Sequence, residues 1–263
     1  MTGPIAEAEK LLLLKASGLM LLVVVPVILM ALAFAWRYRA TNDRAAYSPD
    51  WDRSRVVEIT VWGIPAIMVG LLATMVWDKT HALDPYKPLP GGEPLLVQAV
   101  ALNWKWLFIY PDHGIATVNE LAIPADRPVS FRVTSQVAMN SFIIPDLGGQ
   151  IYAMAGMETQ LNLQANEPGK MQGRNMQFSG TGFPQQTFDV LAMTEADFDG
   201  WIERVRASDQ ALDDRSFAEI SQPSIAAPVT YFASAPQGFF AGLLAGSADM
   251  PHAADTTAEG AGN

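Results

Sequence analysis

The sequence predicts two membrane-spanning helices followed by an all-β domain and a short helical, aromatic-rich extension. Of the 263 residues, 50% are hydrophobic and only 17% are charged, and the mean hydropathy is +0.15, which is unusual for a purely soluble protein of this length. Two long uncharged runs lie in the first third of the chain, and short apolar runs separated by turn residues follow. Part of the chain is therefore expected in lipid and part in a water-soluble domain.

The two uncharged runs extend from Ala16 to Ala35 and from Ile59 to Trp77. At ~1.5 Å per residue each is long enough to cross a hydrocarbon layer of ~30 Å. Each contains a proline, Pro26 or Pro65, which a membrane helix tolerates when a neighbouring group satisfies the freed carbonyl. The alternative for the first run is a cleaved signal peptide. It is disfavoured because the run is too long and no small-residue cleavage site follows it.

The loop between these runs, residues 37–55, predicts the orientation. It carries five arginines against three aspartates. Because short loops rich in Lys and Arg stay in the cytoplasm, we expect this loop to be cytoplasmic. The N-terminal segment and everything after about residue 78 then lie on the outer side. In a bacterium this places the chain in the inner (cytoplasmic) membrane with its β-domain in the periplasm.

After a proline-rich linker, the apolar runs become short and rich in Val, Ile, Phe and Trp. Turn sequences separate them at residues 111–114, 124–126, 146–149, 167–169 and 179–182. Short strands at this spacing predict a β-sandwich or a Greek-key barrel.

A helix is predicted to follow the β-domain. Thr194 is a suitable N-cap, and Glu195 and Asp197 would occupy the first turn. Four apolar residues then recur at helical spacing: Phe198, Trp201, Ile202 and Val205. Beyond this helix, residues 216–244 are expected to be aromatic and loop-like. The final segment of Ala, Gly, Asp and Thr is expected to be disordered.

The sequence thus divides into eight predicted segments. They are an outer N-terminal segment at 1–15, a transmembrane helix at 16–36, a cytoplasmic loop at 37–55, a second transmembrane helix at 56–77, a linker at 78–93, a β-domain at 94–193, a helix and aromatic-rich extension at 194–245, and a disordered tail at 246–263.

Composition excludes several classes of function. The absence of cysteine rules out disulfides, zinc ribbons, iron–sulfur clusters and thiolate nucleophiles. The net charge of −10 argues against nucleic acid, and solubility explains it more simply than attraction to a basic protein. The three histidines, His81, His113 and His252, are too far apart in sequence to form a ligand cluster. Copper in an electron-transfer site needs thiolate and imidazole ligands, so no copper site is expected.

Four long phrases resemble one family. They are 102–111 (LNWKWLFIYP), 114–120 (GIATVNE), 139–145 (MNSFIIP) and 150–157 (QIYAMAGM). Together they resemble subunit II of the haem-copper terminal oxidases, and most closely the ubiquinol oxidase (cytochrome bo type) branch. The resemblance implies a cupredoxin-like Greek-key barrel after the two helices. It also implies membership of a proton-pumping complex that oxidises ubiquinol and reduces oxygen to water in an aerobic respiratory chain. The implied partners are subunits I, III and IV and membrane lipid. Two haems and one copper would belong to subunit I and no cofactor to this chain.

The cytochrome c oxidase branch of this family carries a dinuclear copper centre in the β-domain. Matching its ligand phrases onto this sequence shows that each ligand position holds a different residue. The six positions are Asn140, Asn175, Gln177, Ser179, Phe183 and Gln186. Without those ligands the implied electron donor is ubiquinol rather than cytochrome c. We interpret Asn140, Gln177, Ser179 and Phe183 as the remodelled floor of the lost site, where polar groups must hydrogen-bond to each other or to water.

Three further residues receive predicted roles, and no residue of this chain is predicted to be catalytic. Glu58 lies directly before the second apolar run, and the resemblance implies a proton-entry role for it at the cytoplasmic edge of subunit I. Trp104 and Trp106 belong to an alternating aromatic pattern typical of a strand with one buried face. We therefore assign both tryptophans to packing and subunit contact rather than to electron transfer.

Two alternatives stay open at this point. One is a cytochrome c oxidase subunit II, which would require copper, and the other is a free-standing membrane-anchored cupredoxin-like binding or assembly module. Relatives in the quinol oxidase branch commonly begin with a lipoprotein signal and a lipidated cysteine, and neither occurs here. Either the start lacks that segment or the helices alone anchor the chain. The ligands of the haems belong to another chain.

Overall fold

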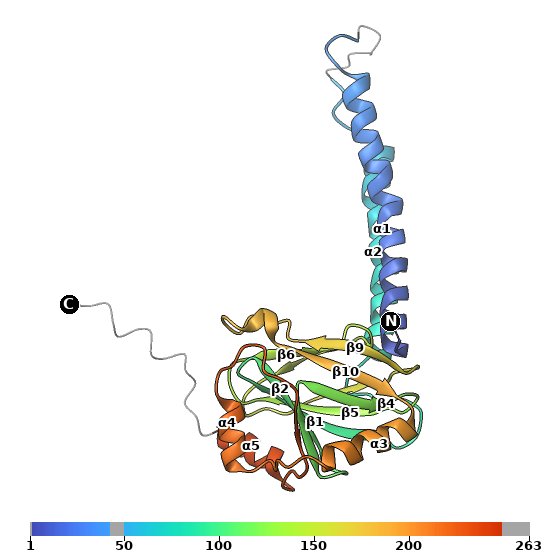
Figure 1. Ribbon diagram of the computed structural model, residues 1–263. Coiled ribbons are helices and arrows are strands. Elements are labelled where there is room, and N and C mark those ends of the chain that lie inside the picture. Colours follow the sequence, from blue (N-terminus) through green and yellow to red (C-terminus); the bar gives the residue numbers. More distant parts are fainter. Residues whose placement is uncertain (1, 43–49, 249–263) are drawn as a thin grey trace, which may run out of the picture. The chain divides into compact units, whose positions relative to one another are not determined.

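The computed structural model describes residues 2–42 and 50–248, which form two compact units (Figure 1). The helical unit is Ala8–Asp84. The β-unit contains the residues from Pro85 onward together with the first residues of the chain, up to Glu7. The predicted cytoplasmic loop lies partly outside the described residues, as do His252 and most of the predicted disordered tail.

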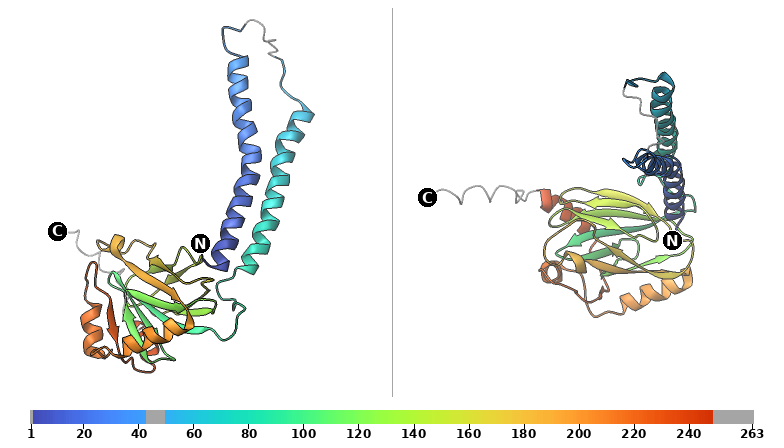
Figure 2. Two further views of the ribbon diagram at one scale, coloured as in Figure 1. Left: turned by 45° about the vertical axis from the view of Figure 1, so that its right-hand side comes forward. Right: turned by 90° about the horizontal axis from the view of Figure 1, so that it is seen from above.

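Two long helices make up most of the helical unit, α1 at Pro4–Arg37 and α2 at Arg55–Ala82 (Figure 2). Both contain apolar stretches long enough to cross a membrane, and no residue of those stretches is buried within the chain. Ser54 caps α2 by accepting a hydrogen bond from Val57 N at 3.5 Å. Because their apolar surfaces are not covered by this chain, the helices require lipid or another protein around them.

Both helices are longer than the predicted spans. α1 begins at Pro4 instead of near residue 16, because proline suits the first helical position and the residues after it favour helix. α2 continues past residue 77 into the predicted linker, since nothing breaks it before Pro85. Hydropathy marks the part of a helix suited to lipid and does not mark where the helix ends.

The β-unit is a sandwich of two sheets. Sheet A has the order β11-β3-β2-β1-β5-β8 and sheet B has the order β4-β10-β9-β6-β7. The strands are β1 Leu95–Leu102, β2 Lys105–Tyr110, β3 Ile115–Val118, β4 Glu120–Pro124, β5 Val129–Ser135, β6 Asn140–Ile143, β7 Gln150–Ala153, β8 Thr159–Leu163, β9 Gly169–Arg174, β10 Thr187–Met193 and β11 Thr230–Phe232. The chain crosses between the sheets, because β4 lies in sheet B while β3 and β5 lie in sheet A, and the pairs β1–β5 and β4–β10 are parallel. The predicted fold class, two membrane-type helices followed by an all-β domain and a helical extension, is confirmed.

Aromatic rings fill the space between the two sheets. Phe142 stacks on Phe188 with ring centroids 5.4 Å apart, and Trp106, Phe108 and Phe131 pack around this pair. Gly173 on β9 is required here, because a Cβ atom at that position would lie 1.9 Å from the ring of Phe188. The core therefore depends on large rings packed against a bare backbone.

Strand β2 is buried on both faces, which corrects the prediction of one buried face. Trp106, Phe108 and Tyr110 point into the sandwich core, and Leu107 and Ile109 belong to a second core. This second core is completed by residues far along the chain, including Leu212, Phe232 and Phe240. The alternating pattern was misleading because the residues that cover the second face come from the C-terminal extension.

The extension is more ordered than predicted. Helix α3 covers Glu195–Arg206, as expected from Thr194, which accepts a hydrogen bond from Asp197 N. The prediction of a loop-like 216–244 is wrong, because α4 at Asp214–Ser221, β11 and α5 at Phe239–Ala248 lie there. Asp213 and Ser216 form a capping box that begins α4. Residues 246–248 of the predicted tail belong to α5, and 249–263 lie outside the described residues.

Candidate functional site

Four of the six positions that the sequence comparison matched to copper ligands meet at one end of the sandwich. Asn140 begins β6, Asn175 follows β9, Ser179 lies in the next loop and Gln186 precedes β10. The side chains of Asn140, Asn175 and Gln186 are almost fully buried, with 0%, 3% and 1% exposure. Buried polar groups must find hydrogen-bond partners inside the protein, so their contacts determine what the site can do.

Asn175 is the centre of this network. Its Nδ2 donates to Asn140 Oδ1 at 2.7 Å and to Gln186 Oε1 at 2.9 Å, with Ser179 Oγ also in range at 3.2 Å. Its Oδ1 accepts from the backbone N–H groups of Ser141 at 2.8 Å and Gln177 at 2.9 Å. Three loops are therefore cross-linked by one amide side chain. We call Asn140, Asn175, Ser179 and Gln186 the amide hub.

The remaining groups of the amide hub are also bonded. Asn140 Nδ2 donates to the carbonyl of Ala138 at 2.8 Å. Ser179 Oγ donates to Gln186 Oε1 at 2.9 Å, and Gln186 Nε2 lies 3.5 Å from the carbonyl of Leu102. The donors and acceptors thus satisfy one another without an ionised group.

Two of the six positions stay outside the network of side chains. Gln177 contributes only backbone atoms, its N–H to Asn175 Oδ1 and its carbonyl to Asn175 Nδ2. Phe183 packs on Phe178, with ring centroids 5.8 Å apart. Within residues 2–42 and 50–248 no three His, Cys, Asp or Glu side chains gather as metal ligands. The donor set of hard amide and hydroxyl groups, already bonded to each other, does not fit copper.

Trp104 holds the loop that carries Ser179. It lies in the turn between β1 and β2 with a left-handed backbone (φ 62°), and its Nε1 donates to the carbonyl of Ser179 at 2.8 Å. Its ring lies against Gly182, where a Cβ atom would come within 2.3 Å of it. A left-handed backbone conformation is uncommon for tryptophan and costs free energy. The contacts of the Trp104 ring must therefore stabilise this conformation by more than that cost. Trp104 therefore belongs to the turn, not to the predicted strand.

Trp106 is fully buried between the sheets. Its ring packs edge-on against Phe142 and Phe188 at centroid distances of 5.3 and 5.7 Å. Its Nε1 has no hydrogen-bond partner among the described residues. Its surroundings are those of a core side chain.

Apolar side chains are exposed on the segments next to the amide hub. Phe178 is 73% exposed and Met176 is 54% exposed, and Met139, Tyr152 and Met157 are also exposed. We call these five side chains the apolar patch. Residues 136–145, 147–157 and 175–188 contain no charged side chain, although the chain as a whole carries a net charge of −10. Exposed apolar side chains without charges are typical of the centre of a protein interface.

Glu58 lies in the first turn of α2. Its Oε1 lies 3.5 Å from Nε of Arg53, and both side chains are largely exposed. A carboxylate at this position is favourable for a helix N-terminus. The arrangement leaves the carboxylate accessible at the end of the helix opposite Ala82.

Comparison with known proteins identifies the family. Residues 206–245 match the cytochrome oxidase aromatic-rich motif. Cytochrome bo(3) ubiquinol oxidase subunit 2 of Pseudomonas aeruginosa is 47% identical over 243 residues, which cover 92% of this chain and 73% of that protein. Ubiquinol oxidase subunit 2 of Acetobacter aceti is 47% identical over 246 residues, covering 92% of this chain and 80% of that protein. The chain belongs to the subunit II family of the bo(3)-type ubiquinol oxidases.

Among solved structures, the periplasmic domain of cytochrome oxidase subunit II from Bradyrhizobium japonicum is 20% identical. It covers 43% of this chain and 95% of that domain, with a TM-score of 0.42. Membership of the ubiquinol oxidase family confirms the resemblance stated from the four sequence phrases. The chain is a membrane-anchored subunit of a multi-subunit ubiquinol oxidase.

The aromatic-rich motif of this family is tied to the sandwich by side chains that the sequence did not single out. Asn103 Nδ2 and Lys105 Nζ donate to the carbonyls of Ser221 and Gln222 at the end of α4. Burial lowers the pKa of the Lys105 ammonium below its usual value. These partners are more than a hundred residues apart in sequence, so no local signal could reveal them.

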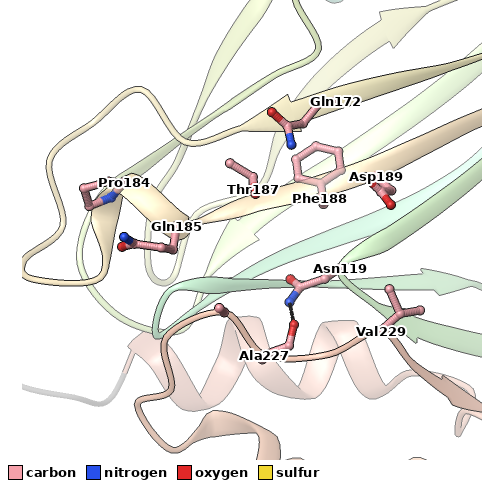
Figure 3. Close-up of a pocket in the computed structure, with 10 residues that line it drawn as sticks. Asn119, Gln172, Pro184, Gln185, Thr187, Phe188, Asp189, Ala227 and Val229 are labelled. Carbon is pink, nitrogen blue, oxygen red and sulfur yellow. Dashed lines mark hydrogen bonds between the residues drawn. The ribbon is translucent and has the colours of Figure 1, made fainter.

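Asn119 makes a further tie, to the carbonyl of Ala227 (Figure 3). It borders an open groove of about 510 Å³ between β9, β10 and the segment before β11. Thr187, Phe188 and Asp189 of β10 line the opposite wall in the same view. Asp189 is paired with Lys170 at 2.8 Å. None of the predicted site residues lines the groove, although Gln185 and Thr187, which flank Gln186 of the amide hub in sequence, do.

Proposed function

We propose that this chain is a cofactor-free subunit that braces the haem-copper subunit of a proton-pumping oxidase, which oxidises ubiquinol and reduces oxygen to water. The main support for this proposal is the amide hub. Its side chains, at positions matched to copper ligands in the cytochrome c oxidase branch, are neutral and hydrogen-bond to each other. A chain with such a site transfers no electrons from cytochrome c. The two haems and one copper of the complex are accordingly assigned to subunit I.

The central experiment is to purify the native complex and measure its haem and copper content and its oxygen uptake. We expect one copper for every two haems, and activity with ubiquinol but not with reduced cytochrome c. Additional copper, or activity with cytochrome c alone, would contradict the proposal in favour of a cytochrome c oxidase. Purification of this chain without any haem would favour a free-standing module.

The bracing role is supported by the surfaces that the chain leaves uncovered. The apolar patch is uncharged, which suits a permanent contact with another subunit better than a transient contact with a basic soluble donor. The helices α1 and α2 likewise present apolar side chains all round. We assign subunits I, III and IV as partners, with lipid against the remaining helix surface.

Substitution of Phe178 and Met176 by serine tests this role. Both side chains are largely exposed, so the β-domain should still fold, and less subunit I should co-purify with the chain in detergent. Ile225→Ser is the matched control, because Ile225 is 51% exposed but lies in the segment between α4 and β11. Full retention of subunit I by the double variant would exclude the patch as the contact surface.

For Glu58 we propose a role in gathering protons at the cytoplasmic entry of a proton path into subunit I. Support comes from the exposed carboxylate at the N-terminal end of a membrane helix, next to Arg53. The proposal puts the loop before α2 in the cytoplasm and the β-domain in the periplasm of a bacterial inner membrane, in agreement with the five arginines of residues 37–55.

The Glu58→Gln variant should slow haem reduction and turnover of the assembled oxidase while leaving its subunit composition unchanged. Asp52→Asn removes a carboxylate from the same loop and serves as the control. Equal turnover of wild type and Glu58→Gln, measured as quinol-dependent oxygen uptake, would eliminate this role.

A further inference from the structure

One carboxylate in the β-unit receives two aromatic donors. Glu120 begins β4, and its Oε1 accepts from the hydroxyl of Tyr231 on β11 at 2.5 Å and from Nε1 of Trp201 on α3 at 3.0 Å. The three residues come from three separate elements. Short hydrogen bonds to a carboxylate are among the strongest that proteins make.

The aromatic rings form a continuous path from the core to the surface. Tyr110 is fully buried, and its ring centroid lies 5.4 Å from that of Trp201, which is 1% exposed. The ring of Trp201 lies 6.3 Å from that of Tyr231, which is only partly buried. Tyr231 is thus the end of the path nearest to solvent.

The two tyrosines differ in what can take their hydroxyl proton. Tyr110 donates to the carbonyl of Ala122 at 3.0 Å, and an amide carbonyl is a very weak base. Tyr231 donates to a carboxylate. Tyr and Trp are the side chains that lose a single electron most readily, and an oxidised phenol is a strong acid. A tyrosine therefore loses an electron most easily when its hydroxyl is hydrogen-bonded to a base that can take the proton. Of the two tyrosines only Tyr231 has such a base, the carboxylate of Glu120, so Tyr231 is the one expected to be oxidised.

We propose that Tyr231, Trp201 and Glu120 form a site that donates one electron to oxygen-derived radicals and so reduces them. We call these three residues the radical sink. An electron leaves Tyr231, directly or through Trp201, and reduces the oxidant. In the same step the phenolic O–H bond breaks and its proton binds Glu120 Oε1. The products are a neutral tyrosyl radical, a protonated Glu120 and the one-electron-reduced oxidant. A small one-electron reductant such as ascorbate, with return of the proton from Glu120, restores the starting state.

The protonation states suit this step. Burial and the hydrogen bond to Glu120 raise the pKa of Tyr231 to about 12, so its hydroxyl stays protonated at neutral pH. The charged groups facing it are Glu120 and Arg204, with Trp201 as the other hydrogen-bonded neighbour. The sink does not depend on the bracing role or on Glu58, because none of its residues belongs to the apolar patch or to the helical unit.

Flash oxidation of the full-length chain in detergent tests the proposal. The oxidant is ruthenium(III) tris-bipyridine, generated by light with persulfate as the electron acceptor, and the radicals are followed by absorbance and electron paramagnetic resonance. At limiting oxidant we expect the Tyr231→Phe variant to lose most of the tyrosyl signal. Glu120→Gln should slow formation of the radical while keeping the fold, because the glutamine Oε1 atom can still accept hydrogen bonds.

The matched control is Tyr152→Phe. Tyr152 is 47% exposed, and its hydroxyl has no carboxylate partner among the described residues. We expect this variant to keep the wild-type signal. The proposal is overturned if Tyr152→Phe removes the signal, or if Tyr231→Phe or Glu120→Gln matches the wild type in yield and rate. Circular dichroism of each variant separates these outcomes from unfolding.

Discussion

Two regions of the β-unit, the amide hub and the aromatic-rich extension, are stabilised by different kinds of hydrogen bond. The amide hub joins loops with neutral side chains that are almost completely buried. The contacts of the aromatic-rich extension include charged groups as well as the amides of Asn103 and Asn119: the ammonium of Lys105 and the carboxylate of Glu120 bond to neutral partners. Neutral amides lose little by burial when all their hydrogen bonds are made, whereas a buried charge retains a desolvation penalty.

This difference predicts different responses to mutation. Removing a member of the amide hub leaves several buried groups unpaired at once. Removing Lys105 takes away one hydrogen bond but also relieves the cost of burying its charge. The hub should therefore dominate stability, and the ties of the extension should dominate the dependence of stability on pH.

The largest effect is expected for Asn175→Ala. It leaves Asn140 Oδ1 and two backbone N–H groups without their partner and removes one of the two donors to Gln186 Oε1, so the free energy of unfolding should fall by about 2–4 kcal/mol. Chemical denaturation of the full chain in detergent, followed by the tryptophan signal, measures this. Gln172→Ala on the exposed face of β9 is the control and should stay within about 0.5 kcal/mol of wild type. Equal stability of the two variants would show that the hub is not a cross-link.

A smaller loss is expected for Gly182→Ala. The backbone at Gly182 (φ −85°) accepts alanine, but the new Cβ atom would lie 2.3 Å from the ring of Trp104. Displacing the ring should cost about 1–3 kcal/mol and change the fluorescence of Trp104. Gly169→Ala has open space around it and provides the comparison. An unchanged emission spectrum and stability would mean that Trp104 does not hold this loop.

The smallest effect at neutral pH is expected for Lys105→Met, about 1 kcal/mol or less, since the lost hydrogen bond and the relieved charge oppose each other. The folded-state pKa of Lys105 is lowered, so the unfolded chain binds more protons below the usual value of 10.5. The stability of the wild type should therefore rise relative to Lys105→Met as the pH increases toward 10.5.

Unfolding free energies of the two proteins between neutral pH and pH 10.5 provide the measurement, because other titrating groups cancel in their difference. A difference that is independent of pH would contradict the contribution of Lys105. If the unfolding free energy of the wild type instead fell relative to that of Lys105→Met as the pH increases, the contribution of Lys105 would have the opposite sign to the one expected.

Much of the architecture could be predicted from the sequence. The apolar runs around Pro26 and Pro65 predicted α1 and α2, and Thr194 predicted the start of α3, because these signals lie within a few residues of the structure they specify. Four sequence phrases were enough to recognise the family, which the relatives confirm. The helices α1 and α2 extend beyond the predicted membrane spans because a helix can continue into segments that are not apolar.

The sequence by itself determined the two helices, the all-β class and the family. Only the tertiary structure decided how Asn140, Asn175, Ser179 and Gln186 bond to each other, why β2 is buried on both faces, and which elements reach Glu120. The reason is physical. Helical periodicity, capping and turn chemistry act between near neighbours, whereas the contacts of Asn140 with Asn175 and of Glu120 with Tyr231 join side chains 35 and 111 residues apart, and their geometry exists only after both sheets have closed.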